Sequence, residues 1–529
     1  REPVGCPTGR SAGDGTGAAG FKADVLVDGD TIAAIGDMQG ESVDRIIDAQ
    51  GRAIAPGFID MHSHADVSLP IFPTADSLMH QGITTIVPGN CGLSPAPLAE
   101  FSRKEFMATI NSDDLPQLPD QEWSSFGEFL DYLEKIGVSP NVVPLVGQGA
   151  VRAAVMGFSS ARPTEEQMEI MQSIVEQSMN EGAAGMSTGL IYPPGSYATT
   201  DELAEVSKPL GVKGGIYFSH IRGEGDTLLE ALQEAVEIGR RSNSQVHVSH
   251  YKAAGADNWD KAQAGLDILD RGRTEGLNIS ADMYPYVAGS TSLVAILPEW
   301  AQEGGYQAIF DRLMDEETRV KMTASMKNEG FFKVAEWDKV FISESKNPDY
   351  TGKTIATLAD KAGKDPYTFI FESLIETKGQ MGMVLFMMSE DNVKMQLKYP
   401  YMMIGTDGAG MPFEGEFAKG VPHPRSFGTY PRVLGKYVRE EKILSLEEAI
   451  WKMTGLPAKT LGLTDRGVIK ALNKADLVIF DPETIIDTAD FANPYQKPAG
   501  IDYVMVNGTI VVEHNTHTMA TPGIVIRKN

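Results

Sequence analysis

Cysteine is scarce in this chain, with only Cys6 and Cys91 among 529 residues. A disulfide framework is therefore excluded as the organising principle of the fold, and the chain fits a reducing compartment. No run of about 18 or more apolar residues occurs, so no membrane-spanning helix is expected. The first residues contain neither a methionine nor an apolar segment, so no signal peptide is visible. These shortages favour a cytoplasmic location, with export left open because the native N-terminus is not identified.

Basic residues are also few compared with acidic ones. Lys and Arg number 46 against 72 Asp and Glu, which gives a formal net charge of −26. Nucleic acids and anionic membranes bind basic faces, so neither is an expected partner. An anionic substrate would need a local cluster of basic side chains. The hydrophobic fraction of 42% supports a large core, and the length suits one catalytic domain plus a smaller one.

Both ends of the chain have the pattern of short antiparallel strands. Residues 23–28 and 31–36 alternate around a turn at 28–30, which predicts a hairpin. Residues 475–481 and 503–512 are also expected to be strands, with Asn507-Gly508 as a type I′ turn. We therefore predict a small β-sandwich domain assembled from residues 1–55 and 464–529.

The middle of the chain alternates short apolar strands with helical stretches such as 164–181 and 227–241. Repeated β–α units imply a parallel sheet. Eight strands over about 350–400 residues predict an α/β fold, a (β/α)8 TIM barrel at residues 56–463. A doubly wound open sheet is the structural alternative. The expected strands are 53–60, 84–88, 142–146, 185–187, 216–219, 246–249, 279–283 and 402–407.

One segment does not follow this alternation of strands and helices. Between Met283 and Met383 about a hundred residues intervene, where a βα unit needs about 30. Residues 300–330 have a helical, charged pattern, and residues 337–349 look irregular. We predict that residues from about 285 to 378 form a lid-like insertion over the barrel mouth.

Metal-ligating residue types stand at the ends of the predicted strands. His62 and His64 form a His-x-His at the end of the first strand, where alternate residues face the same side. Parallel barrels keep their active sites at this end of the strands. Imidazole, thiolate and carboxylate together suit zinc, so a zinc site is predicted. Its candidate ligands are His62, His64, Cys91, His220, His250 and Asp407. We assign His80, His247, His514 and His517 to structure or surface.

This arrangement resembles the amidohydrolase superfamily, and within it the chain looks like the N-acyl-D-amino-acid deacylases (D-aminoacylases). The resemblance covers nearly the whole chain. It implies a zinc-dependent hydrolase that cleaves the amide bond of N-acyl-D-amino acids into a carboxylate and a free D-amino acid. The motifs that carry it are residues 89–92 (GNCG), 187–195 (STGLIYPPG), 219–224 (SHIRGE), 249–252 (SHYK), 282–286 (DMYPY), and 423–425 (HPR) leading to 428–435.

The resemblance also implies roles for individual residues. Cys91, His220 and His250 would hold one tightly bound zinc, while His62, His64 and Asp407 would surround a second, weaker or empty position. Asp407 is the expected general base and acid for attack by a zinc-activated hydroxide. Tyr192 is expected to donate a hydrogen bond to the developing oxyanion.

Recognition of a free substrate carboxylate would need donors near this centre. Lys252 follows His250 by two residues, so it should also face the mouth. Tyr284, Ser290 and Arg425 match family positions that hold this carboxylate, with Arg222 and Lys419 as weaker candidates. Gln148 departs from the pattern, because relatives commonly have a histidine there.

Other functions stay open at this point. A dipeptidase acting on D-residues and a cyclic-amide hydrolase of the same superfamily are alternatives, although residues 185–188 lack the bridging lysine of the latter. A non-catalytic scaffold should have lost ligands, and all six are present. The expected partner is a small N-acyl amino acid. The preferred side chain and acyl group, and any homo-oligomer, are left open.

Overall fold

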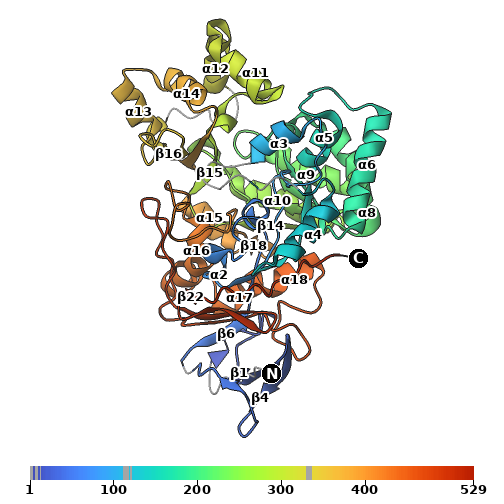
Figure 1. The fold of residues 1–529 in the computed structure, drawn as a ribbon, viewed down its shortest axis with the longest axis vertical. Helices are drawn as coiled ribbons and strands as arrows, with labels where there is room; N and C mark the ends of the chain where they lie inside the picture. Colours follow the sequence, from blue (N-terminus) through green and yellow to red (C-terminus); the bar gives the residue numbers. More distant parts are fainter. Residues whose placement is uncertain are drawn as a thin grey trace.

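The computed structural model describes residues 4–5, 10–11, 13–49, 51–110, 118, 122–328 and 336–528. Three parts follow one another along the long axis of the molecule: a small β-rich part, the barrel, and the insertion at the opposite end (Figure 1). Cys6 and Gly330, the latter a predicted helix end, lie outside the described residues. In the described ranges no helix combines the length and apolar character needed to cross a bilayer.

Within the described residues the barrel wall has eight parallel positions, here called staves, each made of one strand or of two consecutive short strands. Neighbouring staves pair in sequence order. The third stave consists of two short strands separated by Val143 and Pro144. The last stave returns to the first through a parallel bridge between Ser63 and Gly408. This closure excludes the open doubly wound sheet. The strands are β7 (Phe58–Asp60), β8 (Ile83–Ile86), β9 (Asn141–Val142) with β10 (Leu145–Gly147), β11 (Gly185–Gly189), β12 (Ile216–His220), β13 (Gln245–Val248), β14 (Ile279–Met283) and β18 (Met402–Ile404).

Helices surround the staves, and several begin where the sequence predicts. Thr164 caps the helix of 165–180 with a reciprocal Thr164–Gln167 capping box, and the predicted helix 227–241 is observed at 228–242. The helices are α1 (Ala65–Ser68), α2 (Asp76–Met79), α3 (Arg103–Ile110), α4 (Phe126–Ile136), α5 (Gln148–Met156), α6 (Glu165–Asn180), α7 (Thr200–Val206), α8 (Lys208–Lys213), α9 (Leu228–Ser242), α10 (Lys261–Thr274), α15 (Glu390–Leu397), α16 (Arg425–Arg432), a π-helix (Val433–Glu440), α17 (Leu446–Met453) and α18 (Gly455–Leu461).

The first predicted strand, 53–60, is divided in the structure. β6 (Ala53–Pro56) pairs with β19 (Leu477–Phe480) in the small sheet, and β7 belongs to the barrel. The break falls at Gly57, where a Cβ atom would collide with the side chain of Thr84. Only glycine lets the backbone pass this close, so the strand changes sheets here.

The small β-rich part combines both ends of the chain. Its main sheet has the order β2-β6-β19-β20-β21-β22, and the hairpin of β3 and β4 packs against it. Val27, Ile32, Leu477 and Met505 are among the residues of the shared core. The turn at 507–508 has positive φ at both residues, 45° and 78°, which confirms the type I′ prediction. The remaining strands are β1 (Val4–Gly5), β2 (Arg10–Ser11), β3 (Asp24–Asp28), β4 (Thr31–Gly36), β5 (Arg45–Ile46), β20 (Ile501–Val506), β21 (Thr509–Glu513) and β22 (Thr516–His517).

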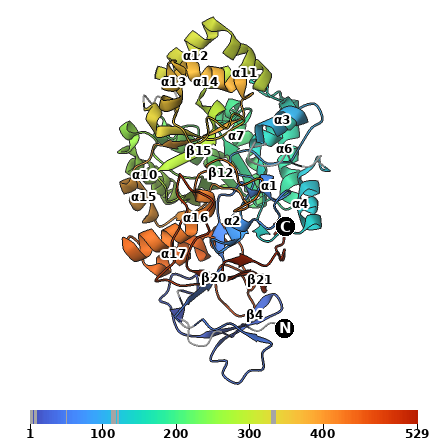
Figure 2. The ribbon, with the colours of Figure 1, turned by 60° about the vertical axis from the view of Figure 1, so that its left-hand side comes forward.

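In its described residues the insertion combines helices and an antiparallel sheet around a core of its own, which includes Leu293, Ile342, Phe371 and Met383. Its three-stranded antiparallel sheet has the order β15-β17-β16, and its helices lie at the far end of the molecule (Figure 2). The prediction of irregular structure was wrong for residues 337–345, which form a 3-10 turn and β16. The unit continues past residue 378 to the end of β17. Its elements are β15 (Ala288–Ser292), α11 (Gly305–Met314), α12 (Glu316–Asn328), β16 (Val340–Ser345), α13 (Ile355–Ala362), α14 (Pro366–Glu376) and β17 (Met381–Phe386), with 3-10 turns at 293–296, 299–302 and 337–339.

Candidate metal centre and active site

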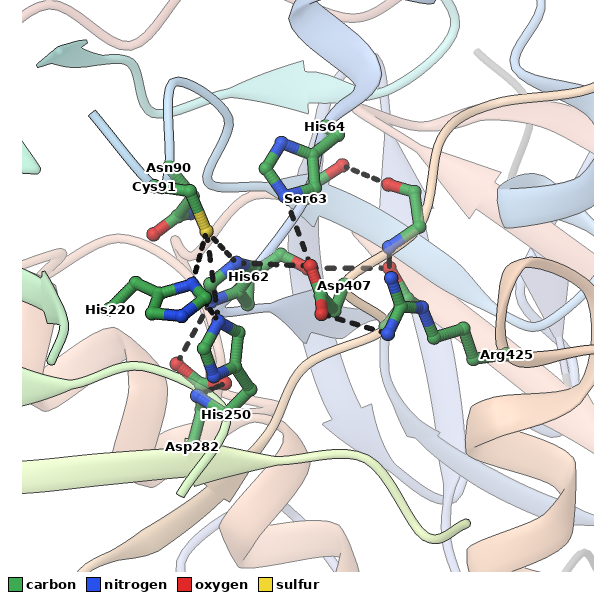
Figure 3. Close-up of polar contacts among 12 residues, drawn as sticks. His62, Ser63, His64, Asn90, Cys91, His220, His250, Asp282, Asp407 and Arg425 are labelled. Atoms are coloured by element: carbon green, nitrogen blue, oxygen red, sulfur yellow. Dashed lines mark hydrogen bonds and ion pairs between the residues drawn. The ribbon is translucent and has the colours of Figure 1, made fainter. Parts of the chain in front are cut away.

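The six predicted ligands converge at the carboxyl ends of the staves (Figure 3). Cys91, His250 and Asp407 have φ values of 56°, 34° and 49°, in the left-handed region that non-glycine residues rarely adopt. Such strained backbone is concentrated at functional sites, where the surrounding structure holds it. Here it occurs at three of the residues whose side chains meet over the barrel mouth.

Cys91, His220 and His250 form one compact group. The Cys91 sulfur lies 3.6 Å from His220 Nδ1 and 3.7 Å from His250 Nε2, and the two nitrogens are 3.0 Å apart. Zinc in a tetrahedral site, with Zn–S of about 2.3 Å and Zn–N of about 2.0–2.1 Å, would separate sulfur from nitrogen by about 3.6 Å and two nitrogens by about 3.3 Å. The three atoms therefore fit one zinc ion.

Cys91 also belongs to a second group, with His62, His64 and Asp407. Its sulfur lies 3.4 Å from His62 Nε2, while Asp407 Oδ1 lies 3.3 Å from His62 Nε2 and 3.0 Å from His64 Nε2. Burial raises the pKa of the Cys91 thiol, but His62 and hydrogen bonds from three histidines outweigh burial and hold that pKa well below its usual range. The thiolate is the form that binds metal.

Glu224 supports the first group, although we did not predict a role for it. Its Oε1 lies 3.0 Å from His250 Nδ1 and 2.7 Å from Lys252 Nζ. Burial raises the pKa of Glu224, but Lys252 and the two histidines outweigh burial and hold that pKa well below its usual range. A carboxylate on the outer ring nitrogen fixes the orientation of a metal-binding histidine.

Asp282 has a similar place beneath the cluster and was also missed. Its carboxylate accepts a hydrogen bond from the His250 backbone N–H at 2.9 Å and lies 2.8 Å from His247 Nε2 and 3.5 Å from His62 Nδ1. His247 is buried and has Ser280 on its other ring nitrogen at 2.8 Å. This placement agrees with the structural assignment of His247.

Arg425 adjoins the catalytic candidate Asp407. Its Nη1 forms a 2.9 Å ion pair with Asp407 Oδ2, Nη2 donates to the Ser290 carbonyl oxygen, and the guanidinium lies 4.8 Å from the centre of the Tyr284 ring. Burial raises the pKa of the Asp407 carboxyl, but Arg425 and His62 outweigh burial and hold it well below its usual range. The pairing with Arg425 and His62 thus favours the ionised form of Asp407.

The remaining predicted residues line the same cavity with partners of their own. Lys252 Nζ lies 2.7 Å from His250 Nδ1 as well as beside Glu224. The Ser290 hydroxyl donates to the Met383 carbonyl oxygen, and the Tyr192 hydroxyl lies 3.0 Å from Thr291 Oγ1. The rings of Tyr192 and His220 are nearly perpendicular, with their centres 5.2 Å apart.

The cavity has a volume of about 1190 Å³ and lies between the barrel mouth and the insertion. Arg222 is not among its lining residues, because it is bound to Glu234 and to two backbone carbonyls. Lys419 and Gln148 are also absent from the lining, and Gln148 is buried at the start of α5. Arg222 and Lys419, which the sequence analysis named as weaker candidates for the pocket, thus do not line it.

Comparison with known proteins agrees with this geometry. The model of the amidohydrolase family matches residues 45–512. D-aminoacylase of Alcaligenes xylosoxydans xylosoxydans is 36% identical, over 97% of this chain and 96% of its own. The chain belongs to the D-aminoacylase branch of the amidohydrolase family. It is therefore an amidohydrolase, and its (β/α)8 barrel is the fold of its relatives.

Two solved structures place metals in such relatives. A D-aminoacylase structure described by its binuclear metal centre has a TM-score of 0.84 and 34% identity, with all of both chains covered. The N-acyl-D-glutamate deacylase of Bordetella bronchiseptica, solved with zinc and a phosphonate that mimics the tetrahedral intermediate, has a TM-score of 0.84 and 32% identity, again with full coverage of both chains. Within its described residues this amidohydrolase has two groups of side chains that could hold a metal ion, and the two groups share Cys91.

Proposed function

We propose that this amidohydrolase cleaves N-acyl-D-amino acids at the amide bond with a zinc ion held by Cys91, His220 and His250. The observation that carries the proposal is the Cys91–His220–His250 triangle, whose edges of 3.0–3.7 Å suit one tetrahedral zinc. His62, His64 and Asp407 would form a second, weaker position that shares Cys91. The names of the relatives, a D-aminoacylase and an N-acyl-D-glutamate deacylase, support the substrate class.

A bound zinc would supply the acidity that makes hydroxide available near neutral pH and would polarise the substrate carbonyl. Asp407, ionised beside Arg425, would accept the proton of the attacking water and return it to the departing amine nitrogen. The Tyr192 hydroxyl would turn from Thr291 to the carbonyl oxygen and donate a hydrogen bond as negative charge develops there.

The substrate carboxylate would be bound by Arg425, Lys252, Tyr284 and Ser290. Arg425 is the main candidate because its planar group offers several donors and only part of them contact Asp407 and the Ser290 carbonyl. Lys252 already lies against Glu224, so its charge is partly balanced. It would contribute through orientation of His250 as well as through direct contact.

The test combines metal analysis with a matched substrate screen. Purified protein should contain about one equivalent of zinc and hydrolyse N-acetyl-D-amino acids at least tenfold faster than their L-enantiomers. Chelation should remove activity, and added zinc should restore it. A D-dipeptide hydrolysed far faster than any N-acetyl-D-amino acid would favour the dipeptidase alternative, and activity on L-substrates alone would refute the proposal.

Several expectations stay predictions. These are the boundaries 1–55, 56–463 and 464–529, the closing motion of the insertion, the cytoplasmic location and a homo-oligomer.

A further inference from the structure

The cavity is much larger than a small substrate needs. An N-acetyl amino acid has roughly a dozen non-hydrogen atoms, fewer than the drug-sized ligands that occupy cavities of about 300–1,000 Å³. The volume here is about 1190 Å³. The cavity therefore has room for an acyl group larger than acetyl.

The two sides of the cavity differ in chemistry. The candidate carboxylate-binding residues Lys252, Tyr284 and Arg425 follow the sixth, seventh and eighth staves. Leu93 and Phe158 line the cavity from segments that follow the second and third staves. In a closed ring of eight staves, these two groups lie on opposite sides of the central metal cluster.

The apolar side extends under the contact between α3 and the insertion. Met107 and Ile110 of α3 and Ile309 and Phe310 of α11 all line the cavity. The two helices meet where the side chain of Glu105 packs against Gly305, whose missing Cβ leaves room for it. Both ribbon views show α11 next to α3 (Figures 1 and 2). Apolar side chains such as Met381 and Met411 line other parts of the cavity as well. We call the part next to α3 and α11 the arm, and it is lined by Leu93, Met107, Ile110, Phe158, Ile309 and Phe310.

We propose that this arm binds the acyl chain of the substrate and that the enzyme acts on N-acyl-D-amino acids with long apolar acyl groups. The inference rests on the proposed function. In such a substrate the carboxylate and the acyl chain lie on opposite sides of the scissile amide. With the carboxylate at Arg425 and the amide at the metal cluster, the acyl chain extends toward Leu93 and Met107. The amino-acid side chain branches on the carboxylate side.

Chain length is the direct test, with the zinc-loaded enzyme and N-acetyl-, N-butanoyl-, N-hexanoyl- and N-octanoyl-D-methionine. Each buried methylene should raise kcat/KM by up to about fourfold, so octanoyl should exceed acetyl by about 10²-fold or more. Equal values for acetyl and octanoyl would refute the arm while leaving the proposed function intact. Absence of hydrolysis with every acyl group would refute the proposed function itself.

A second measurement locates the chain in the arm. Ala108 lies on the exposed face of α3 and lines the cavity, so a larger side chain there can enter the arm without disturbing the core. Ala108→Trp should remove the octanoyl advantage and keep N-acetyl-D-methionine turnover within about twofold, while Ala108→Ser should keep both.

Two outcomes would assign the arm differently. If Ala108→Trp instead alters selectivity among N-acetyl-D-amino acids of different side-chain length, the arm holds the side chain. If N-glutaryl-D-methionine is preferred over N-hexanoyl-D-methionine, Lys104, which also lines the cavity, binds an anionic acyl end. Either result overturns the proposal.

Discussion

Replacement of Arg425 by methionine tests the recognition of the substrate carboxylate. Methionine keeps much of the length and packing of arginine but removes every donor. In the protein, the guanidinium pairs with Asp407, donates to the Ser290 carbonyl and lies over Tyr284. The change therefore removes a substrate contact and a partner of the catalytic carboxylate together, and the assay must separate the two.

The magnitude follows from the kind of contact. A hydrogen bond to a charged group contributes about 1.5–3 kcal/mol, which corresponds to about 10- to 150-fold in kcat/KM. We expect this loss mainly as a higher KM, because the carboxylate is bound in ground and transition states alike. Loss of the ion pair between Arg425 and Asp407 should lower kcat/KM for all substrates by the same factor. The ratio of kcat/KM for N-acetyl-D-methionine to that for its uncharged amide cancels this factor.

Wild type should prefer the free acid, and Arg425→Met should reduce this preference to near unity. Arg222→Met is the matched control, because Arg222 is bound to Glu234 outside the cavity lining and its loss should leave the ratio unchanged. A mutant that still distinguishes acid from amide as well as wild type would show that the carboxylate lies elsewhere, with Lys252 the next residue to test.

Three further changes test the metal centre, the proton transfer and the core. Cys91→Ala should lose most of its zinc and activity, whereas Cys6→Ala should keep both; elemental analysis that finds full zinc in Cys91→Ala would refute the ligand assignment. Asp407→Asn should keep zinc but lose about 10²–10⁴ in kcat, so near-normal turnover would remove Asp407 from the mechanism. Burial lowers the pKa of Lys452 from 10.5 to about 8. Between these values the unfolded chain binds more protons than the folded protein, so stability rises with pH. Wild type should therefore gain about 2 kcal/mol relative to Lys452→Met between pH 7 and 9.5, measured by thermal unfolding, and parallel pH profiles of the two proteins would contradict this.

The ends of the barrel strands could be predicted from the sequence because short apolar runs and polar strand ends are local signals. His220 and Asp407 directly follow such runs, and they meet because parallel staves share one mouth. Glu224 carries no comparable signal, because a carboxylate in a loop is usually solvated and only the folded chain buries it against His250. Asp282 stands within a strand, and nothing local shows that it faces three histidines from two other segments.

The structure of the insertion likewise depends on contacts between distant residues, which local sequence signals do not reveal. β16 pairs with β17, about 40 residues further along the chain, and residues 337–349 carry no regular alternation that reveals this partner. The division of the first predicted strand at Gly57 depends on contact with Thr84, which is also invisible locally. The basic cluster expected from sequence is balanced in the structure, because Lys252 and Arg425 each face a carboxylate. Bound metal would therefore contribute much of the positive charge at this site.

The end of the chain has a bearing on how the protein is made. Residues 523–526 run beside the third stave, where Val525 bridges Val142 and the Ile526 amide donates to the Val142 carbonyl at 2.8 Å. β6, which leads into the first stave, likewise pairs with β19 far downstream. Because synthesis proceeds from the N-terminus, the edges of β6 and of the third stave stay uncovered until β19 and residues 523–526 have been made. Until then these strand edges present unpaired N–H and C=O groups that another chain could pair with.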